Sequence, residues 1–178
     1  MELLENKILG ILKGIGTIAL YFIVSLICSY LFRNYTFSDN IVIATLFQIL
    51  TYVILLLVIG AIYHKRLIRD FKNFKKEYVG VALKNWIIGL GAMFIANIII
   101  SSIAGGIASN EEANRTLLGN YPISSFISMV FLGPLIEELT FRASFKSAFS
   151  KWYIFALVTA LLFGSAHISS FITTKDFL

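Results

Sequence analysis

Long apolar stretches separated by short polar segments dominate the chain. Five of them are candidates for membrane-spanning helices, because each runs for roughly 20 mostly uncharged residues, the length that crosses a bilayer as a helix. The pattern predicts an all-α fold, a polytopic transmembrane helical bundle of about five spans that forms a single domain over residues 1–178. The expected spans cover about residues 8–32, 41–63, 85–104, 121–149 and 152–172.

The composition favours a membrane protein over a soluble domain. Hydrophobic residues make up 58% of the chain and charged residues 14%, and the mean hydropathy is +0.83, whereas a soluble domain is about 25% charged. The basic residues gather between apolar stretches, which is typical of a membrane anchor. We therefore expect membrane lipid as a partner and no nucleic acid. A single cysteine, Cys28, excludes an intramolecular disulfide.

Lys and Arg residues are distributed unevenly over alternate segments of the chain. Because cytoplasmic segments carry an excess of Lys and Arg, the count predicts the orientation. With a cytoplasmic N-terminus, inside segments hold twelve of the fifteen basic residues and outside segments hold three. Residues 64–84 are then a basic cytoplasmic linker that can lie on anionic lipid as an interfacial helix. The polar segment 105–122 is expected to be an outer loop with at most about one helical turn.

Three charges interrupt the fourth apolar stretch, in the sequence GPLIEELTFRASF at residues 133–145. A helix continuing through them to residue 149 places Glu137 at membrane depth, where a carboxylate costs about 2.5–3.5 kcal/mol. Arg142 follows Glu138 by four residues, so the two are predicted to form an ion pair on one face. Glu137 lies about 100° away around the helix and has no basic residue at that spacing.

Pro134 precedes the two carboxylates. It has no backbone N–H to donate, so we expect the helix to bend there and to open a polar pocket beside Glu137, with Pro134 as a supporting residue. An ion cluster that only holds helices together is the alternative interpretation of the three charges.

The sequence FGSAH at residues 163–167 places His167 in the fifth apolar stretch. If residues 123–170 fold as a helical hairpin that turns near residue 150, His167 comes within about 6 Å of the level of Glu137 along the helix axis. The small residues 164–166 are expected to let the two helices approach closely. Glutamate beside imidazole can polarise water, as can a divalent metal such as zinc with enough ligands. The pattern therefore predicts hydrolysis of a peptide bond at or within the membrane.

EELTFR resembles the EExxxR motif, and FGSAH the FxxxH motif, of the CAAX protease and bacteriocin-processing (CPBP) family. The family is also known as the Abi or type II CAAX prenyl endopeptidase family. The motifs follow each other on consecutive helices in the family's order, and the resemblance covers about residues 123–170. Members are intramembrane endopeptidases, so the resemblance implies a protease of a bacterial cell membrane that acts on a peptide or protein substrate.

The resemblance also implies a role for each matching residue. Glu137 would be the base that activates water, and Glu138 and Arg142 would hold it and the helix in place. His167 would orient or polarise the water, and His167 and Glu137 would be metal ligands if a metal is used. Phe163 would pack the site.

The third motif of the family, HxxxN or HxxxD, is missing. His64, the other histidine, is followed four residues later by Ile68. We expect either a truncated form of a longer protein, which the end of the chain soon after His167 favours, or a protein that has lost part of the site; this form would then be weakly active or inactive. One alternative function is a non-catalytic bacteriocin self-immunity or peptide-binding membrane protein. Another is a small transporter that uses Glu137 as a proton site.

Overall fold

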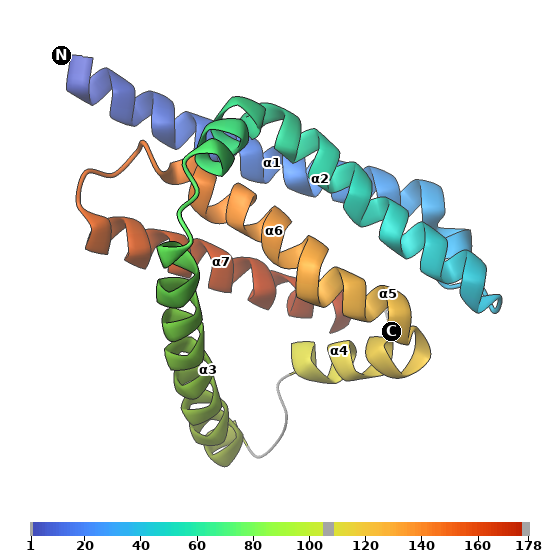
Figure 1. Cartoon of the computed structure of the whole chain (residues 1–178). Coiled ribbons are helices and arrows are strands. Elements are labelled where there is room, and N and C mark those ends of the chain that lie inside the picture. The colour runs from blue at the N-terminus through green and yellow to red at the C-terminus, as the bar shows by residue number, and fades with distance from the viewer. Residues whose placement is uncertain (1, 105–108, 176–178) are drawn as a thin grey trace.

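The computed structural model describes residues 2–104 and 109–175, without the side chains at some positions, including all of those from residue 167 onward. The described residues form helices and no strand, which confirms the predicted all-α fold (Figure 1). Four helices are long and apolar enough to cross a membrane, and a shorter apolar helix, described over Trp152–Ala166, follows them. A bundle of about five spans is consistent with this arrangement.

The element order follows the five predicted apolar stretches. The first three long helices are α1 (Glu2–Thr36), α2 (Ile41–Lys72) and α3 (Glu77–Ala104). A short helix, α4 (Ser109–Asn120), leads into the fourth stretch, and α7 (Trp152–Lys175) ends the described chain. The fourth stretch, Pro122–Phe145, is called the motif helix below and changes its helical type along its length: α5 (Pro122–Ile127), η1 (Ser128–Leu132), α6 (Gly133–Glu137), η2 (Glu138–Arg142) and η3 (Ala143–Phe145).

Helices α1 and α2 form an antiparallel pair joined by a short turn. The side chain of Asn40 caps the start of α2 by accepting hydrogen bonds from the backbone N–H groups of Val42 (3.0 Å) and Ile43 (3.4 Å). Such a cap satisfies backbone donors that have no partner inside the helix. Beside the turn, the rings of Tyr35 and Phe47 stack with centroids 4.6 Å apart. The turn and the stacked pair fix the register of the two helices.

The motif helix lies between the α1–α2 pair and α7 (Figure 1). Its Leu139 forms a buried cluster with Ile59 and Tyr63 of α2, and Leu20 and Tyr21 of α1 pack against this cluster. Three helices therefore meet at the residue that directly follows Glu138. This packing positions the site.

Two glycines let α1 approach the end of the motif helix. A Cβ atom at Gly10 would lie 2.7 Å from the backbone nitrogen of Ala148, and one at Gly14 would lie 2.4 Å from the ring of Phe145. The two glycines are four residues apart and so share a face of α1, as in other close helix contacts in membranes. This contact was not predicted from the sequence.

Two segments between the spans differ from the sequence prediction. Helix α2 continues to Lys72 and α3 begins at Glu77, so most of the basic segment 64–84 belongs to these two helices. The expected outer loop contains α4, a helix of 12 residues, instead of about one turn. Segment 105–122 is polar, and its helical length could not be read from apolar spacing.

The segments predicted to share the cytoplasmic side lie at one end of the bundle. Lys13 of α1, Lys65 and Arg66 of α2, and Lys146 after the motif helix line a common cavity there. The guanidinium of Arg66 donates a 2.7 Å hydrogen bond to the carbonyl oxygen of Ala143. This interaction ties the end of α2 to the end of the motif helix.

Candidate active site

The motif helix contains two π-helical turns. In the first, the N–H of Gly133 donates to the carbonyl of Ser128, and in the second the N–H of Ala143 donates to the carbonyl of Glu138. The first turn directly precedes Pro134, where the sequence predicted a bend. A π turn changes the hydrogen-bond register at the point where proline cannot donate, and such turns occur often at functional sites.

Five of the predicted site residues line one pocket of about 270 Å³. We call it the motif pocket, and its lining consists of Pro134, Glu137, Glu138, Phe141, Arg142 and Phe163. The motif helix contributes all of these residues except Phe163, which comes from α7. The hairpin thus brings the charged residues of the first motif and Phe163 of the second motif to the same pocket, as its predicted turn near residue 150 required.

The predicted ion pair between Glu138 and Arg142 forms. The guanidinium Nη1 donates to the carboxylate Oε2 at 2.6 Å, a short distance that is typical of a charge-assisted hydrogen bond. Their side chains are 52% and 62% exposed. The pair therefore lies on the outer side of the motif helix, where it borders the motif pocket and does not enter the core.

Glu137 points to a different environment from Glu138. It is half-buried, between the buried residues Ile136 and Leu139. Its carboxylate lies close enough to Tyr21 of α1 and Tyr52 of α2 to interact with their hydroxyl groups electrostatically. The two neighbouring glutamates therefore have separate surroundings, one beside an arginine and the other beside two phenols.

The sequence analysis did not identify the two tyrosines near Glu137, although each interrupts an apolar span. Polar groups at membrane depth are expensive, and a tyrosine there needs a partner for its hydroxyl. Their position in the middle of apolar spans was the sequence feature that could have identified them as candidate site residues. Which residue they would face depends on the packing of α1 and α2 against the motif helix, and local spacing does not contain that information.

A row of aromatic rings connects the motif helix to α1 and α7. The ring of Phe141 lies edge-to-face with Phe163, with centroids 5.6 Å apart, and with Tyr21 at 6.2 Å. Phe163 thus contacts the motif helix at the motif pocket, where the family resemblance implied that it would pack the site. The expected close approach at the small residues 164–166 is not found at Gly164, because a Cβ there would meet no described atom within 4 Å.

His167 lies in α7, one helical turn after Phe163, but its side chain falls outside the described part. Its role remains a prediction. His64 is elsewhere, in the cavity at the basic end of the bundle, with its Nδ1 2.7 Å from the carbonyl oxygen of Ala61. It takes no part in the motif pocket.

The described side chains do not assemble a metal site. No three His, Cys, Asp or Glu side chains come together among them, and of the two glutamates at the motif pocket Glu138 is paired with Arg142. Structural and catalytic zinc sites use at least three protein ligands. The side chain of His167, one of the two predicted metal ligands, lies outside the described part.

A model of a known protein family matches the C-terminal part of the chain. Residues 119–177 match the model of the Rce1-like family, type II CAAX prenyl endopeptidase Rce1-like. No curated protein and no solved structure matches the chain. The matched segment contains the motif helix and α7, and with them both sequence motifs. The match covers a third of the chain and supports the resemblance to this family over the segment that carries the motifs.

Proposed function

We propose that this protein is an intramembrane endopeptidase in which Glu137 activates the hydrolytic water. The observation that carries the proposal is the motif pocket, since it gathers Glu137, Glu138, Arg142 and Phe163 from two helices. The family match supports the reaction class. The substrate would be a membrane-associated peptide or protein whose scissile bond reaches the pocket.

The two glutamates would have different tasks. Glu138 is held by Arg142 at 2.6 Å, so its charge is neutralised and it stiffens the helix. Glu137 is half-buried and one residue earlier, and it is the group we assign to proton transfer. A general base must lie within hydrogen-bond reach of the water that it deprotonates. The pocket beside it has room for that water and for part of a peptide.

The reaction would proceed in two steps. The water oxygen attacks the carbonyl carbon of the peptide while Glu137 takes one water proton, which leaves a tetrahedral oxyanion. The C–N bond then breaks, and Glu137 returns the proton to the leaving nitrogen, so that a carboxylic acid and an amine are released. In this scheme His167 would orient or polarise the water, which is the role implied by the family motif.

Cleavage of a membrane peptide by the protein in liposomes tests the proposal. The chain contains no HxxxN or HxxxD sequence, so the assay should include a second form, extended by a helix that carries this third motif. We expect the extended form to cleave and Glu137→Gln to reduce its rate by about 10²–10⁴, the usual contribution of a general base. Glu112→Gln, at an exposed glutamate of α4, is the matched control and should cleave normally.

The outcomes separate the alternatives. Equal cleavage by Glu137→Gln and the parent protein would show that Glu137 is not the base. Peptide binding without cleavage in both forms would favour a non-catalytic peptide-binding or immunity protein. Proton uptake that depends on Glu137, without cleavage, would favour a transporter. Helix content measured by circular dichroism shows whether each variant is folded.

A further inference from the structure

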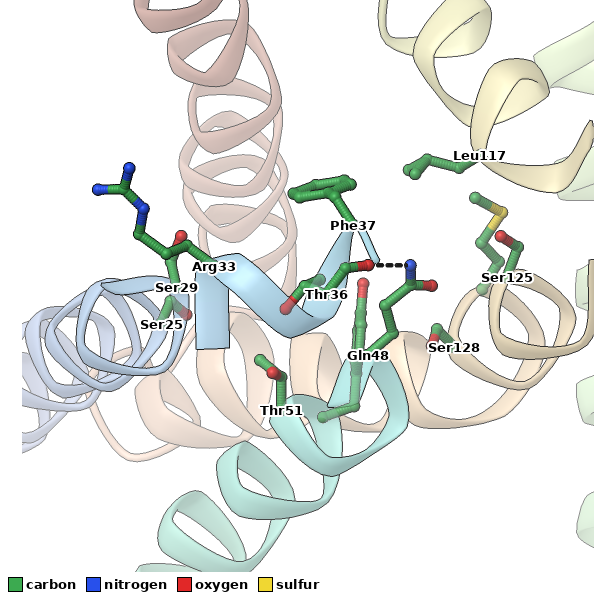
Figure 2. Close-up of a pocket in the computed structure, with 12 residues that line it drawn as sticks. Ser25, Ser29, Arg33, Thr36, Phe37, Gln48, Thr51, Leu117, Ser125 and Ser128 are labelled. Carbon is green, nitrogen blue, oxygen red and sulfur yellow. Dashed lines mark hydrogen bonds between the residues drawn. The ribbon is translucent and has the colours of Figure 1, made fainter. Parts of the chain in front are cut away.

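A second cavity lies on the other side of the motif helix from the motif pocket. It is at the end of the bundle away from the cavity that Lys13, Lys65, Arg66 and Lys146 line. It has a volume of about 250 Å³ and is lined by α1, α2, α4 and the first part of the motif helix (Figure 2). Most of its lining residues are polar, among them Ser25, Ser29, Thr51, Ser125 and Ser128. We call it the hydroxyl cavity.

The hydroxyl group of Ser128 in this lining has no hydrogen-bond partner among the described atoms. Ser128 is 5% exposed, and among the described atoms its Oγ makes no hydrogen bond. A buried hydroxyl without a partner costs about 1–3 kcal/mol. A water molecule in the cavity would remove that cost, because it can donate to Ser128 and also bond to the neighbouring hydroxyls.

An amide holds the walls of the hydroxyl cavity in place. Gln48 of α2 donates a 2.8 Å hydrogen bond to the carbonyl oxygen of Thr36, at the end of α1 (Figure 2). It also accepts one of 2.5 Å from the hydroxyl of Ser124 in the motif helix. Three helices are thereby linked around the space. Gln48 interrupts the second apolar stretch near its start, and in the structure it bridges these helices.

The cavity extends from the surface toward Glu137. Phe37, which is largely exposed, lies at the outer end, and the guanidinium of Arg33 points away from the other lining side chains (Figure 2). Ser25 lies eleven residues earlier in α1 than Thr36, which corresponds to about 16 Å along the helix. The lining therefore reaches about half of the way through a bilayer core of about 30 Å.

Tyr52 connects the hydroxyl cavity with the carboxylate. It lines the cavity, and a Cβ added at Gly133 would lie 3.8 Å from its ring, so the ring packs beside the motif helix one turn before Glu137. Its hydroxyl interacts electrostatically with Glu137. Tyr21, which is one turn from Ser25 on α1, interacts with Glu137 in the same way.

We propose that the hydroxyl cavity is filled with water and supplies the hydrolytic water to Glu137 past the hydroxyl of Tyr52. A volume of 250 Å³ holds several water molecules, since each occupies about 30 Å³ in the liquid. Hydrolysis in a bilayer needs such a route, because the lipid core excludes water. The filling of the cavity stands on its own geometry, while the supply to Glu137 rests on the proposed function.

Thiol reactivity in membranes tests the filling. Ser128→Cys and Thr140→Cys are compared in a Cys28→Ser background, with a small charged methanethiosulfonate reagent. Thr140 is the matched control, because it is fully buried on the same helix, its hydroxyl also lacks a described partner, and it is not among the residues lining the hydroxyl cavity. Thiols react as thiolates, which form in water, so we expect Ser128→Cys to react at least about tenfold faster.

A second experiment tests whether the hydroxyl cavity supplies water to Glu137. Attaching a bulky reagent to the thiol of Ser128→Cys should slow Glu137-dependent cleavage at least about tenfold, because the route is blocked, while the same reagent on Asn114→Cys in exposed α4 should not. Labelling after denaturation measures the amount of each variant.

Each outcome decides one part of the proposal. Equal, slow reaction of the thiols at positions 128 and 140 would overturn the water-filled cavity, as would reaction of position 128 with a lipid-soluble maleimide alone. Normal cleavage after modification at position 128 would overturn the supply route. If no form of the unmodified protein cleaves, the proposed function fails and the thiol result still decides whether the cavity holds water.

Discussion

The hydroxyl groups of Thr17 on α1 and Tyr63 on α2 lie 2.7 Å apart in the buried interface of the two helices. Thr17 donates its own proton to the carbonyl oxygen of Lys13 at 2.8 Å, so the Tyr63 hydroxyl must be the donor in the pair. The ring of Tyr63 packs against Leu139 of the motif helix. One tyrosine therefore joins the α1–α2 pair to the helix that carries the site.

Replacing Tyr63 by phenylalanine should remove this hydrogen bond and leave the rest of the packing. We expect a loss of about 0.5–1.5 kcal/mol in stability, the usual net value of one such bond, seen as a lower midpoint of thermal unfolding in detergent. Tyr30→Phe is the control, since Tyr30 is 75% exposed on α1. An equal midpoint for both variants would show that the bond contributes nothing.

The contact between α1 and the end of the motif helix predicts opposite effects at two nearby glycines. Gly10→Ala places a methyl group against the backbone of Ala148, and we expect a loss of about 1–3 kcal/mol, as in other overpacked sites. Gly16→Ala meets no described atom within 4 Å and should be neutral or stabilising, because alanine favours the helix. Midpoints of thermal unfolding, measured for both variants in the same detergent, test this prediction. An unchanged midpoint for Gly10→Ala would contradict the close contact between α1 and the end of the motif helix.

Local spacing predicted the spans, the hairpin and the Glu138–Arg142 pair, because each depends on residues close together along the chain. It did not predict the tyrosines beside Glu137 or the bridge made by Gln48. Those contacts depend on how α1 and α2 rotate and slide against the motif helix. The Gly10–Gly14 pair carried a readable signal in its four-residue spacing, but the spacing does not say which helix would pack there.

The Glu138–Arg142 ion pair is exposed on the protein surface, so its removal should have a modest cost. We expect Arg142→Ala to lower stability by about 1 kcal/mol or less, and the double variant with Glu138→Gln to recover part of that loss, because no carboxylate is then left without its partner. The Arg66–Asp70 pair, which has the same spacing at 3.3 Å, is the control cycle. Additive effects at Glu138 and Arg142 would show that the two residues do not interact.

The arrangement of basic segments at one end of the bundle predicts their side of the membrane. Cysteines introduced at Asn73, after α2, and at Asn114, in α4, can be labelled in intact cells with an impermeant thiol reagent in a Cys28→Ser background. If the basic end is cytoplasmic, position 114 is labelled and position 73 is not, until the cells are opened. The reverse pattern would overturn the proposed orientation.

The π turn at Ser128–Leu132 has a consequence for how the protein tolerates changes in length. Its hydrogen bond spans five residues where an α-helix spans four, so the turn holds one residue more than a regular turn. Removing one residue within it would restore an ordinary α-helix and leave Glu137 facing Tyr52. The same deletion in the α-helical part, at Leu135 for instance, would rotate every later residue by about 100°, so single-residue deletions should be accepted at this π turn and rejected in the α-helical part that follows it.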